Sequence, residues 1–307
     1  MASRPFIPII AGPTAVGKTE TSLRVAEALN AEIISADSRQ VYQEFSIGTA
    51  SPTKEDCARV NHHFVREINI GDSFSAGIFA GQVASRILDI ESRKKSILVS
   101  GGSTLYVYAL THGLADIPAV DPQIRETLNV RLQHEGAQVL FSELDQADPT
   151  FAATLDPSKS QRIVRGLEVF IGTGKPLSHF HTSSPLSGVP TRLFVLYRPR
   201  EMLYERINAR VDQMMRDGLV EEVRTILEGN PDLTDNAFRT IGYQELIPAI
   251  RGEYSEDRAI ELIKRNSRRY AKRQLTWYKR YDEAIWINVD ESNSYDEILS
   301  AIGDENL

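Results

Sequence analysis

The residues with the clearest chemical potential form a short glycine-containing segment near the N-terminus. The segment Gly-Pro-Thr-Ala-Val-Gly-Lys-Thr matches the phosphate-binding loop pattern G-x-x-x-x-G-K-[ST] at every fixed position. Its two glycines let the backbone amides point into one concavity, and a helix starting near Lys18 would add its partly positive N-terminus. We therefore expect a binding site for a diphosphate or for nucleotide phosphates. The loop consists of Gly12, Pro13, Thr14, Ala15, Val16, Gly17, Lys18 and Thr19.

Two side chains of this loop suggest how the phosphates would be held. Lys18 supplies a mobile positive charge for the outer phosphates, and the Thr19 hydroxyl suits a magnesium ion that bridges them. Mg²⁺ is therefore the predicted cofactor. The motif leaves open whether the phosphate is transferred, hydrolysed or released as a leaving group.

A carboxylate follows the second predicted strand. Residues 32–35 read as a strand, so Asp37 lies just past its C-terminal end, at the edge where open α/β sheets place their ligands. Residues 96–100 read as a third strand, which closes in Gly101-Gly102-Ser103. This strand lacks the acid with which P-loop ATPases hold magnesium, and its absence weighs against an ATP-hydrolysing motor.

The elements that must position these residues follow the order that the motif requires, which is strand, loop and helix. Residues 6–11 form an apolar run typical of a buried strand, and residues 20–29 carry apolar side chains at helical spacing. Another apolar strand is predicted at 193–197, and a single helix at 201–227. We predict an α/β fold with a P-loop NTPase-like parallel sheet core, flanked by helices, over 1–115 and 192–307. The polar segment 116–191 is predicted to be a helical insertion domain.

The composition of the 307 residues is that of a soluble globular protein, with 41% hydrophobic and 25% charged residues. No apolar run approaches the roughly 20 residues that span a bilayer, and no signal peptide is visible. Cys57 is the only cysteine, which favours a reducing compartment. We expect a cytoplasmic protein, without membrane contact and monomeric.

The net charge of −7 hides a strongly polarised chain. Residues 258–281 carry nine Lys or Arg and one acid, whereas residues 282–307 carry eight acids and no Lys or Arg. Four of these cations share one predicted helix face and suit a phosphate backbone, although a solvated face would look the same. They are Arg265, Arg268, Lys272 and Lys279. Spacing alone leaves the same two readings open for Arg162 and Arg165 in the insertion.

Several stretches, in this order along nearly the whole chain, resemble the tRNA dimethylallyltransferase family. The run from Ser35 to Tyr42 is the most specific, because many kinases share the phosphate loop. The matching stretches are Gly12–Thr19, Ile34-Ser-Ala-Asp-Ser-Arg-Gln-Val-Tyr42, Ile47-Gly-Thr-Ala50, Gly101-Gly-Ser-Thr-Leu-Tyr106, Ile241-Gly-Tyr243 and Lys272-Arg-Gln-Leu-Thr-Trp277.

The resemblance implies transfer of a dimethylallyl group from dimethylallyl diphosphate to N6 of adenosine 37, beside the anticodon of tRNA, with release of diphosphate. It implies that Asp37 accepts the amine proton, while Lys18 and Arg210 stabilise the departing diphosphate. Ser103 stands where the family usually has Thr, whose hydroxyl orients the reacting groups.

The resemblance also implies an RNA-binding surface that grips the anticodon stem-loop between the insertion and the basic helix. The target nucleotide is expected to contact Asp37, Ser38, Arg39, Gln40 and Ser103. The remaining RNA contacts are expected from Arg125, Gln161, Arg162, Ile163, Val164, Arg165, Arg239, Thr240, Ile241, Gly242, Tyr243 and Gln244.

Three alternatives remain open on the sequence. A P-loop small-molecule kinase would use Asp37 as the base for a hydroxyl substrate and would consume ATP. An adenylate isopentenyltransferase would share the prenyl chemistry but would need no RNA-binding ridge. A nucleotide-binding RNA chaperone would lack catalysis altogether.

Overall fold

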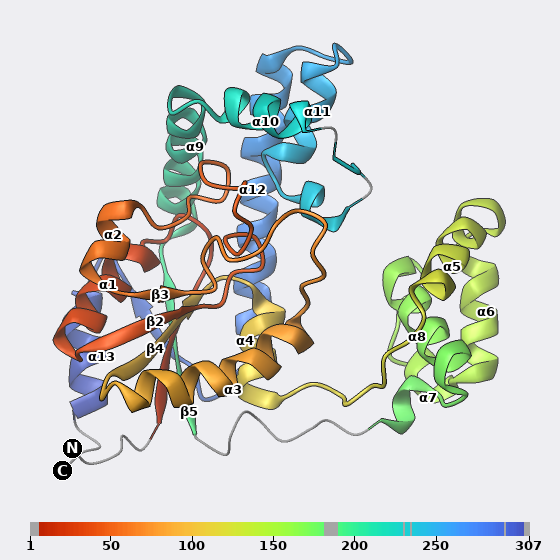
Figure 1. The fold of residues 1–307 in the computed structure, drawn as a ribbon, viewed down its shortest axis with the longest axis horizontal. Coiled ribbons are helices and arrows are strands. Elements are labelled where there is room, and N and C mark those ends of the chain that lie inside the picture. Colours follow the sequence, from red (N-terminus) through yellow and green to blue (C-terminus); the bar gives the residue numbers. More distant parts are fainter. Residues whose placement is uncertain (1–5, 181–189, 230, 234, 292, 304–307) are drawn as a thin grey trace. The chain divides into compact units, whose positions relative to one another are not determined.

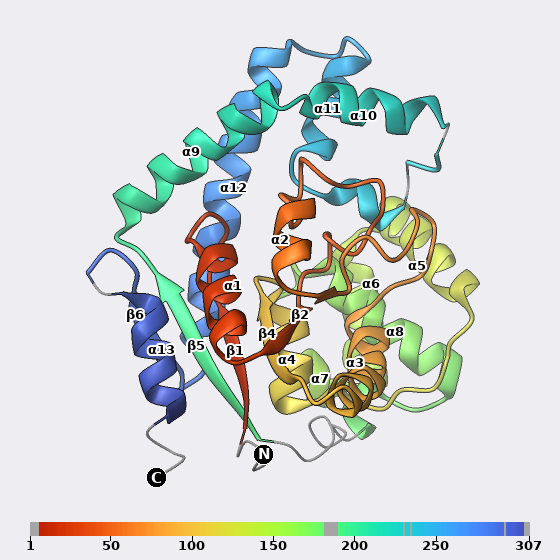
Figure 2. The same cartoon turned by 60° about the vertical axis from the view of Figure 1, so that its left-hand side comes forward.

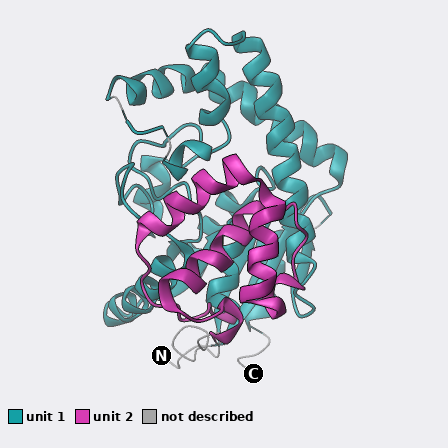
Figure 3. Ribbon diagram, turned by 90° about the vertical axis from the view of Figure 1, so that its right-hand side faces the viewer, with its two compact units in different colours: residues 1–111, 185–307 teal, residues 112–184 magenta. Residues whose placement is uncertain are grey.

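The computed structural model describes residues 6–180, 190–229, 231–233, 235–291 and 293–303. The chain divides into two compact units, Met1–Thr111 with Pro185–Leu307, and His112–Ser184 (Figure 3). The second unit covers a slightly different range from the insertion predicted at 116–191. None of the helices in the described ranges has the length and apolar content needed to cross a bilayer.

The first unit is built on a six-stranded sheet with the order β3-β2-β4-β1-β5-β6, in which every pairing is parallel (Figures 1 and 2). This sheet, flanked by helices, confirms the predicted fold class. The strands are β1 (Ile7–Ala11), β2 (Ala31–Ser35), β3 (His62–His63), β4 (Ser96–Gly101), β5 (Thr191–Tyr197) and β6 (Ile285–Asn288).

The central strands are buried because both faces of the sheet are covered, and β1 is apolar throughout. All five residues of β1 and all five of β2 are buried. Strand β1 lies between β4 and β5, and β2 lies on the far side of β4. Since these strands run parallel, the segments that follow β1, β2 and β4 emerge at one edge of the sheet. The phosphate loop, Asp37 and Ser103 are carried by those three segments.

The helices of this unit connect and cover the strands. Helices α1 and α13 pack together, and so do α9 and α12 (Figures 1 and 2). They are α1 (Lys18–Ala28), α2 (Lys54–Arg59), α3 (Ala76–Ser92), α4 (Thr104–His112), α9 (Arg200–Arg216), α10 (Leu219–Glu228), the 3-10 helix η3 (Asn236–Arg239), α11 (Tyr243–Ile250), α12 (Glu256–Tyr278) and α13 (Ser294–Gly303).

The single helix predicted at 201–227 is wrong, because two helices occupy this range. Gly218 adopts a left-handed conformation, with φ of 98°, and ends the first helix before α10 begins. Glycine takes this conformation without the steric cost that a side chain would add. The turn gives α9 and α10 different directions, so that α9 lines the cavity described below with Arg210, while α10 carries Glu222 behind the cavity wall.

The second unit is a small helical bundle with its own apolar core. Its core side chains include Leu128, Leu140, Leu144 and Leu167. Gly166 allows close packing of α8, since a Cβ there would lie 2.6 Å from the Leu144 side chain. The elements are α5 (Pro122–Glu135), α6 (Ala137–Ala147), α7 (Pro149–Ala152), α8 (Ser160–Thr173) and the 3-10 helix η1 (Leu177–His179).

Candidate active site

The phosphate loop has the backbone that its glycines predict. Gly12 has φ of 150° and passes so close to β5 that a Cβ would lie 2.6 Å from the Leu196 carbonyl oxygen. Gly17 has φ of 116° and occupies the N-cap position of α1, where no side chain caps the helix. The first amides of α1 are therefore open at the loop, as in an anion-binding helix terminus.

Three cations hold carbonyl oxygens of the loop. Lys18 Nζ donates to the carbonyls of Gly12 (3.0 Å) and Pro13 (2.8 Å). Arg198 Nε donates to the Val16 carbonyl (2.9 Å), and Arg206 Nε donates to the Ala15 carbonyl (3.0 Å). Sequence analysis missed both arginines, because only the fold brings β5 and α9 to the loop.

Asp37 is held in place by the backbone that follows it. Its Oδ1 accepts hydrogen bonds from the amides of Arg39 (2.9 Å) and Gln40 (3.3 Å). The end of β4 approaches just as closely, since a Cβ on Gly101 would lie 2.1 Å from the Ala36 carbonyl oxygen. Only glycine fits at position 101, and the close approach brings the two strand ends together.

Ser103 supports this segment and does not open into the cavity. Its hydroxyl accepts from the Ser38 amide (2.8 Å), donates to the Ser38 hydroxyl (3.1 Å) and interacts with Tyr270, while only 7% of the residue is exposed. Burial, reinforced by the Asp37 charge, raises the pKa of Tyr270 to about 12, so its hydroxyl keeps its proton. Ser103 thus supports Asp37 and Ser38 through these hydrogen bonds, and its catalytic role stays a prediction.

Three charged groups meet at the open side of the loop. Burial lowers the pKa of Lys18 to about 8, with Asp37 opposing this shift and Arg210 adding to it. Burial also lowers the pKa of the Arg210 guanidinium, again against the effect of Asp37. Arg210 Nη2 donates to the Thr49 carbonyl (3.4 Å). The site thus combines an anion pocket with a carboxylate.

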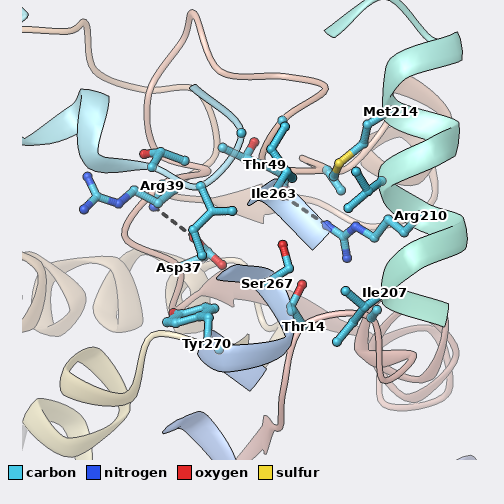
Figure 4. Close-up of a pocket in the computed structure, with 18 of the residues that line it drawn as sticks. Thr14, Asp37, Arg39, Thr49, Ile207, Arg210, Met214, Ile263, Ser267 and Tyr270 are labelled. Carbon is cyan, nitrogen blue, oxygen red and sulfur yellow. Dashed lines mark hydrogen bonds between the residues drawn. The ribbon is translucent and has the colours of Figure 1, made fainter. Parts of the chain in front are cut away.

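These groups line one cavity of about 900 Å³ (Figure 4). Among the predicted diphosphate-binding residues, Thr14, Ala15, Gly17, Lys18 and Thr19 line it, whereas Gly12, Pro13 and Val16 lie beneath the loop surface. The other predicted site residues that line the cavity are Asp37, Ser38, Arg39, Gln40, Arg210, Arg239, Thr240, Ile241, Gly242 and Gln244.

An apolar wall flanks Arg210 in the same cavity. Ile207 and Met214 project from α9, and Ile263 lies opposite on α12 (Figure 4). Val211 of α9 lines the same cavity. Ile207, Val211 and Ile263 are each at most 3% exposed. A ligand in this cavity can therefore place an anionic end on the phosphate loop and an apolar part against α9.

Two residues predicted to contact RNA have side chains that already form hydrogen bonds with other parts of the protein. Tyr243 is fully buried, and its hydroxyl donates to Glu222 (2.6 Å). Gln40 accepts from Ser35 through Oε1 (3.2 Å) and donates through Nε2 to the carbonyls of Thr49 (3.3 Å) and Ala50 (3.1 Å). The predicted RNA contact of Tyr243 is wrong because its ring packs in the interior, and the amide of Gln40 joins two segments of the cavity wall.

The insertion residues predicted to grip RNA separate into exposed and buried sets. Ile163 and Val164 are 0% exposed in the core of their unit, so direct RNA contact by these side chains is ruled out. Gln161 and Arg162 are exposed on α8. Arg125 and Arg165 both pair with Glu168, at 3.1 and 3.0 Å.

The arginines of the basic helix α12 that line the cavity lie outside the ridge of four cations predicted to bind a phosphate backbone. Arg269 and Arg273 line the cavity together with Tyr270 and Gln274. Arg265 and Arg268 line a separate groove, and Arg268 donates to Asn208 (2.6 Å). Helical spacing predicted the cations, but the face that meets the site depends on packing against α9.

Gln274 is a further residue that sequence analysis missed. It is 2% exposed and joins the phosphate loop to the end of β4. Its Oε1 accepts from the Thr14 amide (3.0 Å), and its Nε2 donates to the Gly102 carbonyl (2.7 Å). The one available signal was its place in the matched stretch 272–277.

Comparison with known proteins places this geometry in a family. The family model for IPP transferase matches residues 40–281. The chain belongs to the IPP transferase family. It is 49% identical over 298 residues to the tRNA dimethylallyltransferase of Salinibacter ruber, covering 97% of this chain and 92% of that protein. It is 43% identical over 293 residues to the tRNA dimethylallyltransferase of Chloroherpeton thalassium, covering 94% of this chain and 91% of that protein.

Solved structures of the IPP transferase family agree with the fold. The full-length tRNA isopentenylpyrophosphate transferase of Bacillus halodurans has a TM-score of 0.71 at 35% identity, over 99% of this chain and 98% of that chain. A eukaryotic dimethylallyltransferase, crystallised as it acts on tRNA, has a TM-score of 0.75 at 25% identity, over 92% of this chain and 73% of that chain.

Proposed function

We propose that the protein is a tRNA dimethylallyltransferase, which transfers a dimethylallyl group from dimethylallyl diphosphate to N6 of adenosine 37 in tRNA. The observation that carries this proposal is the single cavity that joins the phosphate loop, Asp37 and the apolar wall of α9. A kinase site explains the first two features but needs no apolar wall beside the cation Arg210. Membership of the IPP transferase family supports the same reaction.

We propose one orientation for the donor in the cavity. Its diphosphate would lie on the loop amides beside Lys18, and its five-carbon group would lie against Ile207, Val211 and Met214. This places C1 of the allyl group between the loop and Asp37. Arg210, which shares the helix face of the apolar wall, would contact the diphosphate oxygens next to the bond that breaks.

The acceptor is an adenine, whose N6 is a weak nucleophile because its lone pair is delocalised into the ring. It must leave the base stack of the anticodon loop to enter the cavity. The C1–O bond of the donor breaks as the N6–C1 bond forms, and one proton leaves N6. Asp37 Oδ2 takes that proton, because the hydrogen bonds given above occupy Oδ1.

The departing diphosphate carries away the electron pair of the C1–O bond. Lys18, the loop amides and Arg210 stabilise the charge that develops on it, in a site built before the reaction begins. The cost of reorganising water around the anion is thereby avoided. The products are prenylated tRNA and free diphosphate.

The residues also fit a magnesium ion that enters with the donor. Mg²⁺ usually keeps several waters and binds through one or two protein oxygens together with substrate phosphates. Thr19 offers a hydroxyl at the first turn of α1, open to the cavity. Within the described ranges no group of three or more His, Cys, Asp or Glu could hold a metal without a substrate. When bound, the ion would neutralise charge on the diphosphate.

We further propose that RNA is held by cations of both units. In the first unit Arg269 and Arg273 line the cavity, and in the insertion Arg162 is exposed on α8. The anticodon stem-loop is the part of tRNA that must be held, because it contains the target base. The protein is further proposed to be a cytoplasmic monomer.

The test offers the purified protein three acceptors at once. Radiolabelled dimethylallyl diphosphate and magnesium are incubated with unmodified tRNA, AMP and ATP, and the label is followed by chromatography. The proposal predicts label in tRNA alone. Label in AMP or ATP would indicate an adenylate isopentenyltransferase, and transfer of phosphate from ATP to another molecule would indicate a kinase. Either result would contradict the proposal.

A further inference from the structure

A loop of the cavity wall is held from behind by a carboxylate that the proposed mechanism does not use. Glu222, on α10, accepts hydrogen bonds from the backbone amides of Ser46 (3.1 Å), Ile47 (2.8 Å) and Gly48 (3.1 Å). Three successive amides that converge on one anion form a nest. Here the anion is a side chain of the protein itself, so the nest joins residues 46–48 to α10.

An aromatic side chain secures the same loop from a second direction. Tyr243 Oη donates to Glu222 Oε1 (2.6 Å), and the Tyr243 ring stacks on Phe45 with ring centroids 4.0 Å apart. Gly48 lies directly against this ring, since a Cβ there would come within 2.5 Å of it. The loop therefore has little freedom to move towards α11.

The same loop connects Glu222 and Tyr243 with Arg210 and Asp37. Gly48, Thr49 and Ala50 line the cavity. The Thr49 carbonyl accepts from Arg210 (3.4 Å) and from the side-chain amide of Gln40 (3.3 Å). The backbone amide of Gln40 donates to Asp37 (3.3 Å). A displacement of the loop would therefore move the partners of both Arg210 and Asp37.

We infer that Glu222 is a positioning residue for the transfer reaction, which holds residues 46–50 so that Arg210 and Asp37 keep their places. The inference rests on the proposed function. Glu222 lies outside the set of residues that line the cavity, so its effect passes through the loop. A carboxylate suits this role because both oxygens accept, whereas a glutamine would turn its NH₂ group towards amide donors.

The test measures transfer to tRNA by the Glu222→Gln variant. The matched control is Glu221→Gln, the same substitution at the neighbouring position. Glu221 is exposed on the same helix and pairs only with Arg224 among the contacts described. We expect Glu222→Gln to lower kcat by about 10- to 100-fold, the cost typical of a small misplacement of reacting groups. The Kd for inorganic diphosphate should change less than kcat does, because Lys18 and the phosphate loop are untouched. Glu221→Gln should match the wild type in both measurements.

A second variant reaches the same loop without changing Glu222. Gly48→Ala places a methyl group against Tyr243 and should likewise lower kcat while diphosphate binding is retained. If thermal unfolding shows that Glu222→Gln is not folded, the Gly48→Ala variant tests the inference in its place. A wild-type kcat in either folded variant would overturn the inference. Absence of transfer by the wild-type protein would instead overturn the proposed function, and the role of Glu222 with it.

Discussion

Asp37 owes its position to backbone contacts, and within the described residues it forms no ion pair. Its Oδ1 is held by two amides, and the segment that follows it is held by Ser103. The close approach of β2 and β4 depends on Gly101, where any side chain would collide with Ala36. A carboxylate fixed in this way costs nothing to orient when the acceptor base arrives.

At this scale the first prediction concerns the base. Asp37→Asn keeps the shape and the acceptor oxygen but cannot take up a proton. We expect single-turnover transfer to tRNA to slow by about 10²- to 10⁴-fold, the usual contribution of a general base. Titration with inorganic diphosphate should give wild-type binding. The exposed Asp257→Asn is the control, and an Asp37→Asn enzyme as fast as this control would remove Asp37 from the mechanism.

The second prediction concerns Lys18, whose pKa burial lowers to about 8. Only the protonated amine attracts diphosphate, and it predominates below this pH. We therefore expect kcat/KM for dimethylallyl diphosphate, which reports the free enzyme, to fall as the pH rises above about 8. Lys18→Arg, which stays protonated, should lack this alkaline decline. A profile that is flat in the wild type up to the pH of an ordinary lysine would contradict the assignment.

Residues of the phosphate loop could be predicted from sequence because the motif is local, and the types of eight neighbouring positions are enough to recognise it. Ser103 and Tyr243 could not be assigned in this way. The hydroxyl of Ser103 meets Ser38, 65 positions away, and Tyr243 of α11 meets Glu222 of α10, 21 positions away. The sequence shows polar side chains at these positions, but only the fold shows that their partners lie inside the protein.

At the scale of elements, α12 illustrates how far periodicity can go. Its apolar residues recur at helical spacing, and Ile263 among them is 2% exposed. Its basic residues cover more than one face, however, and the spacing could not tell which face meets the cavity. The turn at Gly218 escaped prediction for a related reason, since the apolar pattern continues across it while the backbone changes direction.

The third prediction tests which face of α12 binds RNA. Each phosphate contact contributes roughly 0.7 to 0.9 to the slope of log affinity against log salt concentration. Replacing Arg269 and Arg273 by Ala should therefore reduce the slope for tRNA by roughly 0.7 to 0.9 for each residue. Replacing Arg265 and Arg268, which line the separate groove, by Ala should reduce the slope less.

The control for this series is Arg258→Ala, because Arg258 pairs with Glu261 on the same helix (2.8 Å). Filter binding at several salt concentrations gives the slopes directly. Equal slopes for the cavity pair and the wild type would mean that the cavity face of α12 does not bind phosphates.

At the scale of the whole molecule, the chain separates its tasks between two compact units. The donor site is contained in the first unit, since every residue that lines its cavity belongs there. The insertion has its own core, in which Ile163 and Val164 hold α8 while Arg162 remains exposed. A change at Arg162 should therefore affect RNA without affecting the donor.

The fourth prediction follows from this division. Arg162→Ala should weaken tRNA binding and lower the salt slope by about 1, as expected for one lost phosphate contact. Binding of inorganic diphosphate should stay at the wild-type level. Arg131→Ala is the control within the same unit, because Glu135 and Glu143 already neutralise Arg131. If the two variants bind tRNA alike, the exposed end of α8 has no part in RNA recognition.

The central claim is that the phosphate loop holds a leaving group while Asp37 deprotonates an RNA base. The most direct measurement follows both products of one reaction, with unmodified tRNA, dimethylallyl diphosphate and magnesium. Released diphosphate is quantified, and the tRNA is digested and mapped by mass spectrometry. We predict one diphosphate for each dimethylallyl group, with that group on N6 of adenosine 37 and on no other nucleotide. Unmodified adenosine 37, or diphosphate released without a prenylated base, would contradict the claim.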